Sequence, residues 1–152
     1  MVGRGVIVGG YNRPTEWLEV RSRGGRLRAE SRWKNREISM YMSSPVLVGG
    51  RVFGMTHRRR GQLFCADPAT GEVDWSTTGR LAENAAIVAA GRVLLVLTTD
   101  GNLLVVAADP GGYRELAKYH VSESATWAHP VLVGSKLLVK NRDELLVFDL
   151  AG

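Results

Sequence analysis

The sequence predicts an all-β protein whose short strands form the four-stranded antiparallel blades of a β-propeller. Two observations carry this prediction. The 152-residue chain repeats with a period of 41 to 46 residues, and each repeat divides into short apolar runs separated by turn residues. No stretch of the chain spaces its apolar side chains with the period of a helix. The chain holds about three and a half to four such blades, so we expect a partial propeller.

The repeat is clearest in three segments that begin at Pro45, Ala86 and Pro130, and a weaker copy begins at Val2. Four equivalent positions lie 46, 41 and 44 residues apart: Val6, Val52, Val93 and Leu137. The expected blades are approximately 1–40, 41–82, 83–125 and 126–152. Because the first and last copies are incomplete, an open array of these blades would leave two unpaired edges.

We name the strands of a blade A to D, from the propeller axis outward. The expected strands of the two central blades are 46–48, 52–55 and 62–66, then 86–89, 93–98 and 102–108. These runs are rich in large apolar residues, and turn residues such as Gly-Gly separate them. Along the chain the predicted order is B-C-D, A-B-C-D, A-B-C-D and A-B-C.

An outer strand is expected near residues 26–37, where charged residues occupy every second position: Arg26, Arg28, Glu30, Arg32, Lys34 and Arg36. The residues between them include Leu27, Ala29, Ser31 and Trp33. A period of two predicts one solvated face and one packed face. Residues 1–60 carry 13 Lys and Arg against 4 Asp and Glu, and this strand explains much of that excess. A nucleic-acid-binding arm is less favoured, because no aromatic platform accompanies the charges.

The stretch ADPATGEVDW, from Ala66 to Trp75, predicts a turn followed by an outer strand. Asp67 can accept backbone N–H bonds, and Gly71 can adopt a positive φ. The indole of Trp75 can wedge against the next blade. Asp109 occupies the position of Asp67 in the next repeat, and we assign Trp33 and Tyr119 to the position of Trp75. Because these residues recur, we interpret the stretch as a structural part of each blade and not as a binding site.

This stretch resembles the pyrroloquinoline-quinone (PQQ)-like β-propeller repeat, through Ala66, Asp67, Thr70, Gly71 and Trp75. That repeat occurs in quinoprotein dehydrogenases and in outer-membrane assembly lipoproteins of the BamB type. The resemblance implies a longer propeller of seven or eight blades, of which this chain is a C-terminal part. It also implies export, and hence a periplasmic or extracytoplasmic location if a signal lies upstream. The first residues lack a signal-peptide layout, so a cytoplasmic protein is the other reading.

The reactive side chains gather in the D–A and B–C loops, which antiparallel strands place at one end of a propeller. Our candidate ligand-binding residues are Glu83, Asn84, Trp127 and His129, in loops that lead to the innermost strands. Glu83 and Asn84 could offer oxygens to calcium, Trp127 could stack on a planar ligand, and His129 could act as acid, base or ligand. The alternative is that they bond to loop backbone and plug the axis. The cationic loop from His57 to Arg60 could hold phosphate or carboxylate, or form a solvated hairpin tip.

Several classes of chemistry have no signature in the sequence. Cys65 is the only cysteine, so an internal disulfide, a multi-cysteine zinc site and the adjacent cysteine pair of quinoprotein dehydrogenases are absent. No Gly-x-Ser-x-Gly, His-Glu-x-x-His or P-loop motif occurs, and no apolar run approaches the roughly 20 residues that span a bilayer. We therefore predict no catalytic residue and no metal site in this segment.

These observations favour a non-enzymatic propeller that binds a protein or small ligand. The first alternative is that the chain forms part of an oxidoreductase that depends on PQQ and calcium. Cofactors, namely PQQ and calcium, are expected only under this alternative. The second is polyanion binding through the basic first third of the chain. Expected partners are a protein, missing propeller blades, or a second copy of the chain that closes the ring; nucleic acid is not favoured.

Overall fold

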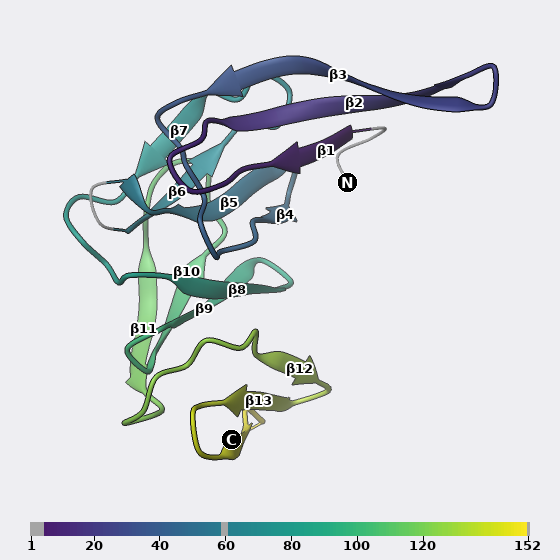
Figure 1. The fold of residues 1–152 in the computed structure, drawn as a ribbon. Coiled ribbons are helices and arrows are strands. Elements are labelled where there is room, and N and C mark those ends of the chain that lie inside the picture. The colour runs from purple at the N-terminus through teal and green to yellow at the C-terminus, as the bar shows by residue number, and fades with distance from the viewer. Residues whose placement is uncertain (1–4, 59–60, 152) are drawn as a thin grey trace.

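The computed structural model describes residues 5–58 and 61–151, which form fourteen strands and no α-helix (Figure 1). The first sheet has the order β1 (Gly5–Val8), β2 (Thr15–Arg23), β3 (Arg26–Asn35). The second has β4 (Val46–Val48), β5 (Arg51–Thr56), β6 (Gln62–Ala66), β7 (Val73–Ser76). The third has β8 (Ala85–Ala90), β9 (Val93–Thr98), β10 (Asn102–Ala107), β11 (Glu115–His120). The fourth has β12 (Val131–Val133), β13 (Lys136–Lys140), β14 (Leu145–Asp149).

All strand pairs within these sheets are antiparallel, and each strand pairs with its neighbours in the chain. The sheets contain three, four, four and three strands, in the order predicted from the repeat. The all-β class and the partial-propeller architecture are therefore confirmed. Arg59 and Arg60 of the cationic loop lie outside the described residues.

The core lies between neighbouring sheets, which stack face to face. In β9, Leu94 and Val96 belong to the cluster shared with the second sheet, whereas Leu95 and Leu97 pack with the fourth. Alternate residues of a strand point to opposite faces, so a strand buried on both faces is apolar throughout. This explains why β9 reads as a continuous apolar run.

One equivalence in the predicted repeat is wrong by one residue. Val52 packs against the preceding sheet, and Leu137 does the same. In β9 that face carries Leu94, not Val93. A shift of one position moves a side chain to the opposite face of a sheet, which a count of repeat spacing cannot detect.

The prediction of a packed face along the basic strand is also wrong over most of its length. β2 and β3 form a hairpin that projects beyond the other sheets (Figure 1), and both faces of β3 are exposed before Trp33. Leu27 is 77% exposed. The short β1 pairs with residues Glu16 to Glu19 of β2, so within residues 5–58 and 61–151 no third strand or neighbouring sheet covers the tip. The end of β3 reaches the next sheet, where Trp33 Nε1 donates to the Pro68 carbonyl at 2.9 Å and Asn35 Nδ2 donates to the Gly71 carbonyl at 2.6 Å.

The recurring aspartates make the same turn contact in three sheets. Asp67 Oδ1 accepts the N–H of the residue two positions later at 2.7 Å, and the matching distances at Asp109 and Asp149 are 2.8 and 3.1 Å. Within the first of these turns Gly71 has φ +77°, and its N–H donates to the Asp67 carbonyl. Thr70 Oγ1 accepts the N–H of the residue after Gly71, while Ala66 is buried against Val52. These residues close the C–D turn.

Tryptophans tie the outer strands β3 and β7 to the turn of the following sheet. Trp75 Nε1 donates to the Asp109 carbonyl at 2.8 Å, as Trp33 does to Pro68. Trp33 and Trp75 each come directly after the extra residue of a β-bulge in the outer strand. In β11 of the third sheet the residue directly after the bulge is Ala117. The assignment of Tyr119 to this position is therefore wrong, and Tyr119 is 55% exposed.

Candidate binding site at the loop-rich end

The D–A and B–C connections lie at one end of the stacked sheets, because every strand pair is antiparallel. The D–A connections run from β3 to β4, from β7 to β8 and from β11 to β12. The B–C connections join β1 to β2, β5 to β6, β9 to β10 and β13 to β14. Three hollows open among these loops, and we name them by what lines them.

The aromatic hollow has a volume of about 410 Å³ and is lined by Tyr11, Tyr41, His57, Arg80, Glu83 and Asn84. The ring centroid of Tyr11 lies 4.9 Å from that of Tyr41 and 4.8 Å from that of His57. The Tyr11 and His57 rings are stacked, with 30° between their planes. Tyr11 is nevertheless 60% exposed. Three loops thus present a joined aromatic surface to solvent.

His57 is held in place on both sides of its ring. Nδ1 lies 2.8 Å from the Ser39 carbonyl oxygen, and Nε2 lies 3.2 Å from Oδ1 of Asn12. A carbonyl oxygen only accepts, so Nδ1 carries a proton in this arrangement. Both ring nitrogens already have partners, and the ring therefore serves as a fixed wall beneath Tyr11.

Asn84 supplies the unmatched polar group of the aromatic hollow. Its backbone carbonyl accepts the Thr99 N–H at 3.0 Å, which fixes the loop to the start of the β9–β10 connection. The side chain is buried, and its Nδ2 has no hydrogen-bond partner in the described part of the chain. Leaving a buried amide donor unpaired costs about 1–3 kcal/mol. A ligand oxygen that reached this donor would recover part of that free energy.

The tryptophan hollow has a volume of about 420 Å³, and its lining includes Arg80, Glu83, Asp100 and Trp127. Arg80 and Glu83 line the aromatic hollow as well, so the two share a wall. Burial raises the pKa of Asp100, but hydrogen bonds with Thr98 and Asn102 outweigh it and lower the pKa below its usual value. This carboxylate is therefore a stable negative charge beside Trp127.

The structure brings the four predicted ligand residues only partly together. Glu83 and Asn84 share the aromatic hollow, and Glu83 also meets Trp127 in the tryptophan hollow. Trp127 is 52% exposed. His129 is exposed and lines neither hollow, so the predicted group of four does not form one site.

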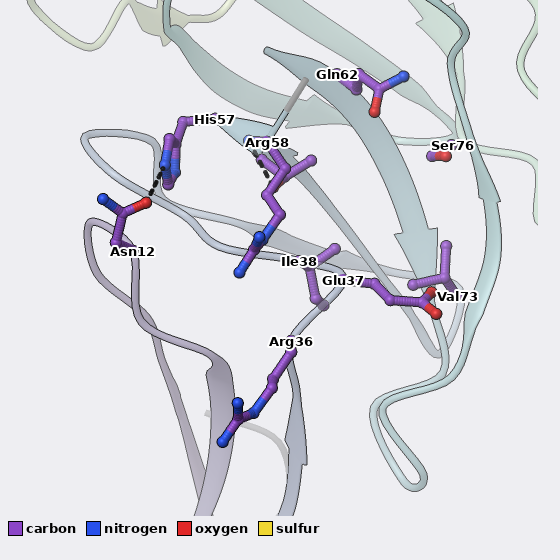
Figure 2. A pocket seen from close by; sticks show the side chains of 10 residues that line it. Asn12, Arg36, Glu37, Ile38, His57, Arg58, Gln62, Val73 and Ser76 are labelled. Carbon is purple, nitrogen blue, oxygen red and sulfur yellow. Dashed lines mark hydrogen bonds between the residues drawn. The ribbon is translucent and has the colours of Figure 1, made fainter. Parts of the chain in front are cut away.

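The arginine hollow is the largest of the three, at about 770 Å³ (Figure 2). Its lining residues are Asn12, Arg36, Glu37, Ile38, Thr56, His57, Arg58, Gln62, Val73 and Ser76. His57 lines both this hollow and the aromatic one. Sequence reasoning missed Arg36 and Arg80 as site residues. Their one visible signal was position in a D–A loop.

A PQQ molecule with a calcium ion would require a stacking ring beside a set of oxygen ligands. Trp127 and Asn84 line different hollows. Among residues 5–58 and 61–151, no group of three or more His, Cys, Asp or Glu side chains could hold a metal ion. The same residues contain no helix long and apolar enough to cross a membrane.

Residues 3–77 match the family described as outer membrane protein assembly factor BamB. The fold is similar to BamB from Moraxella catarrhalis, with a TM-score of 0.72 and 18% identity over 97% of this chain and 44% of that one. The β-propeller domain of Cps50 (Swd1) from Myceliophteria thermophila gives a TM-score of 0.67 and 12% identity, over 96% of this chain and 52% of that one.

A europium-containing methanol dehydrogenase gives a TM-score of 0.51 and 17% identity, over 70% of this chain and 22% of that one. No curated protein matches the sequence. The chain thus spans less than half the length of the BamB structure. At these identities the likeness concerns the fold.

Proposed function

Because this chain is a PQQ-like β-propeller protein, we propose that it is a non-enzymatic scaffold that binds a protein partner at its loop-rich end. The observation that carries the proposal is the aromatic hollow. There two exposed tyrosines lie over a fixed histidine, next to a buried amide donor that lacks a partner among the described residues. The assembly-factor role named for the matching family agrees with this.

The chemistry of the hollow suits a polypeptide ligand. Tyrosine rings offer large contact area with few rotatable bonds, and tyrosine and arginine are the residues enriched at binding hot spots. Tyr11, Tyr41 and Arg80 provide such a cluster within one hollow. The buried Asn84 side chain also lines this hollow, and its Nδ2 could donate to a backbone carbonyl of the ligand if the amide turned toward the hollow.

The test is selection of binding peptides by display on the 152-residue chain, followed by affinity measurements on variants. Tyr11→Ala with Tyr41→Ala should weaken selected peptides at least about tenfold, since each ring is a hot-spot residue. Tyr119→Ala is the matched control, because Tyr119 is an equally exposed tyrosine on β11. Equal affinity for the double variant and the control would contradict the proposal, as would saturable PQQ binding at the same hollow.

We further propose that a second copy of the chain covers the open face of the fourth sheet. Val131, Leu138 and Val147 lie side by side across its three strands. Val131 and Val147 are 52% and 55% exposed. The first sheet has the complementary uncovered face, with Val6 opposite Leu18. Two copies can cover both faces reciprocally, as in a two-fold oligomer.

Light scattering tests this second contact. A mass of twice 16.6 kDa is expected for the chain, and Val147→Glu should halve it without changing the far-UV circular dichroism. A monomeric wild-type chain would exclude the contact, and so would a Val147→Glu variant that remains dimeric.

A further inference from the structure

The arginine hollow holds two cationic side chains that come from different sheets. Arg36 follows β3, the last strand of the first sheet, and Arg58 follows β5 in the second. Both side chains line the hollow, and Figure 2 shows Arg36 extending away from Gln62 and Ser76. Both are exposed. The fold, rather than the sequence, brings these two charges to one cavity.

Neither guanidinium has an acidic partner among the described residues, although other arginines of the chain do. Arg21 and Arg32 pair with Glu19, and Arg51 pairs with Asp67 and Asp74. The one carboxylate that lines the hollow, Glu37, extends toward Val73 in Figure 2. The hollow therefore presents a net positive charge.

Guanidinium groups bind carboxylate and phosphate through paired N–H donors. Further polar groups line the same hollow, among them Thr56, Gln62 and Ser76. Asn12 is fixed beside them by its contact with His57. Ligand oxyanions in this space would neutralise charges that the described residues leave unpaired.

Resting on the proposed function, we infer that the arginine hollow binds acidic side chains of the same protein partner whose apolar residues enter the aromatic hollow. The two hollows share His57, so one extended segment can reach both. Ile38 and Val73 form apolar walls, which suit the mixed side chains of a polypeptide better than a continuous phosphate chain. These features favour an acidic polypeptide over a nucleic acid.

The experiment uses a short fluorescein-labelled peptide of alternating glutamate and tyrosine, and the same peptide with glutamine replacing glutamate. Fluorescence anisotropy gives the affinity for the 152-residue chain and its variants. Arg36→Ala with Arg58→Ala should weaken the glutamate peptide at least about tenfold. The same variant should leave the glutamine peptide unchanged, and rising salt should reduce the difference.

Arg26→Ala with Arg28→Ala is the matched control, because it removes the same charge from the exposed tip of the β2–β3 hairpin. An effect of that control equal to the hollow variant would overturn the inference, since net charge would then explain the binding. An oligonucleotide that displaces the peptide and binds more tightly would also overturn it.

Failure of this inference is distinguishable from failure of the proposed function. If selected peptides depend on Tyr11 and Tyr41 but the Arg36 and Arg58 variants bind the acidic peptide normally, only the inference fails. If the chain selects no peptide and binds neither labelled probe, both fail. Circular dichroism of each variant provides the check that its fold is retained.

Discussion

Replacement of Gly71 by alanine should destabilise the chain by an amount set largely by Trp33. Gly71 and Gly50 have nearly equal φ values, +77° and +76°, so alanine at either position costs about 1–2 kcal/mol of backbone strain. At Gly50 a new Cβ meets nothing within 4 Å. At Gly71 it would lie 2.5 Å from Cε3 of Trp33, so the ring must move.

Displacement of Trp33 would also break its bond to the Pro68 carbonyl, worth about 0.5–1.5 kcal/mol. We therefore expect Gly71→Ala to lower the free energy of unfolding by about 1.5–3.5 kcal/mol, against about 1–2 kcal/mol for Gly50→Ala. Urea unfolding with an unchanged m-value is the measurement. The control is a double-mutant cycle: in a Trp33→Ala background, Gly71→Ala should cost no more than Gly50→Ala. Equal losses for the two glycine variants in the wild-type background would refute the reasoning.

Three further outcomes are expected. Burial is the larger cause and the hydrogen bond to Asp74 the smaller cause of a rise in the pKa of Cys65 to about 12. The folded chain should therefore resist alkylation by iodoacetamide at mildly alkaline pH, and unfolding in urea should make the thiol reactive. Rapid labelling without urea would contradict this expectation. Because the pKa of Asp100 is lower in the folded chain than in the unfolded chain, ionised Asp100 stabilises the fold at pH values above its ordinary pKa of about 3.9. This stabilisation is lost as the pH falls through the pKa that Asp100 has in the folded chain. In a plot of the unfolding midpoint against pH, Asp100→Asn should therefore reduce the slope at acid pH. Glu30→Gln, at an exposed position, should leave that slope unchanged. Asn84→Leu should raise the free energy of unfolding by about 1 kcal/mol, since it removes an unpaired buried donor, yet weaken selected peptides; a loss of stability would indicate a partner for Nδ2.

The turn-and-strand pattern of the fold could be predicted from the residues because it depends on local chemistry. An aspartate that accepts the N–H two residues later forms the same contact at Asp67, Asp109 and Asp149. Alternation of apolar residues with turns located the strands of the two central sheets to within a residue or two at each end. The end of the sheets that carries the reactive loops followed from strand direction alone.

The errors arose where the length of a connection mattered. Counting back from the next sheet assigned Tyr119 to the tryptophan position, but the register of β10 and β11 gives that position to Ala117. In the second sheet the Asp67 N–H donates to the Glu72 carbonyl and closes the C–D turn. In the third sheet the Ala107 N–H donates to the Arg114 carbonyl. Trp75 and Ala117 each lie eight residues after the recurring aspartate, but β8 begins ten residues after Trp75 and β12 begins fourteen residues after Ala117. The longer D–A connection therefore misplaced a count made backward from the next sheet.

The sequence by itself therefore determined the strands, the turns and the end at which functional loops gather, because each depends on near neighbours in the chain. The tertiary structure alone decided which side chains share a hollow. Tyr11, Tyr41 and His57 come from three loops on two sheets, and their contact depends on how those sheets stack. Trp127 and His129 are two residues apart, yet only Trp127 lines the tryptophan hollow. Adjacent positions in an irregular loop can point in different directions, and packing against neighbouring sheets selects between them.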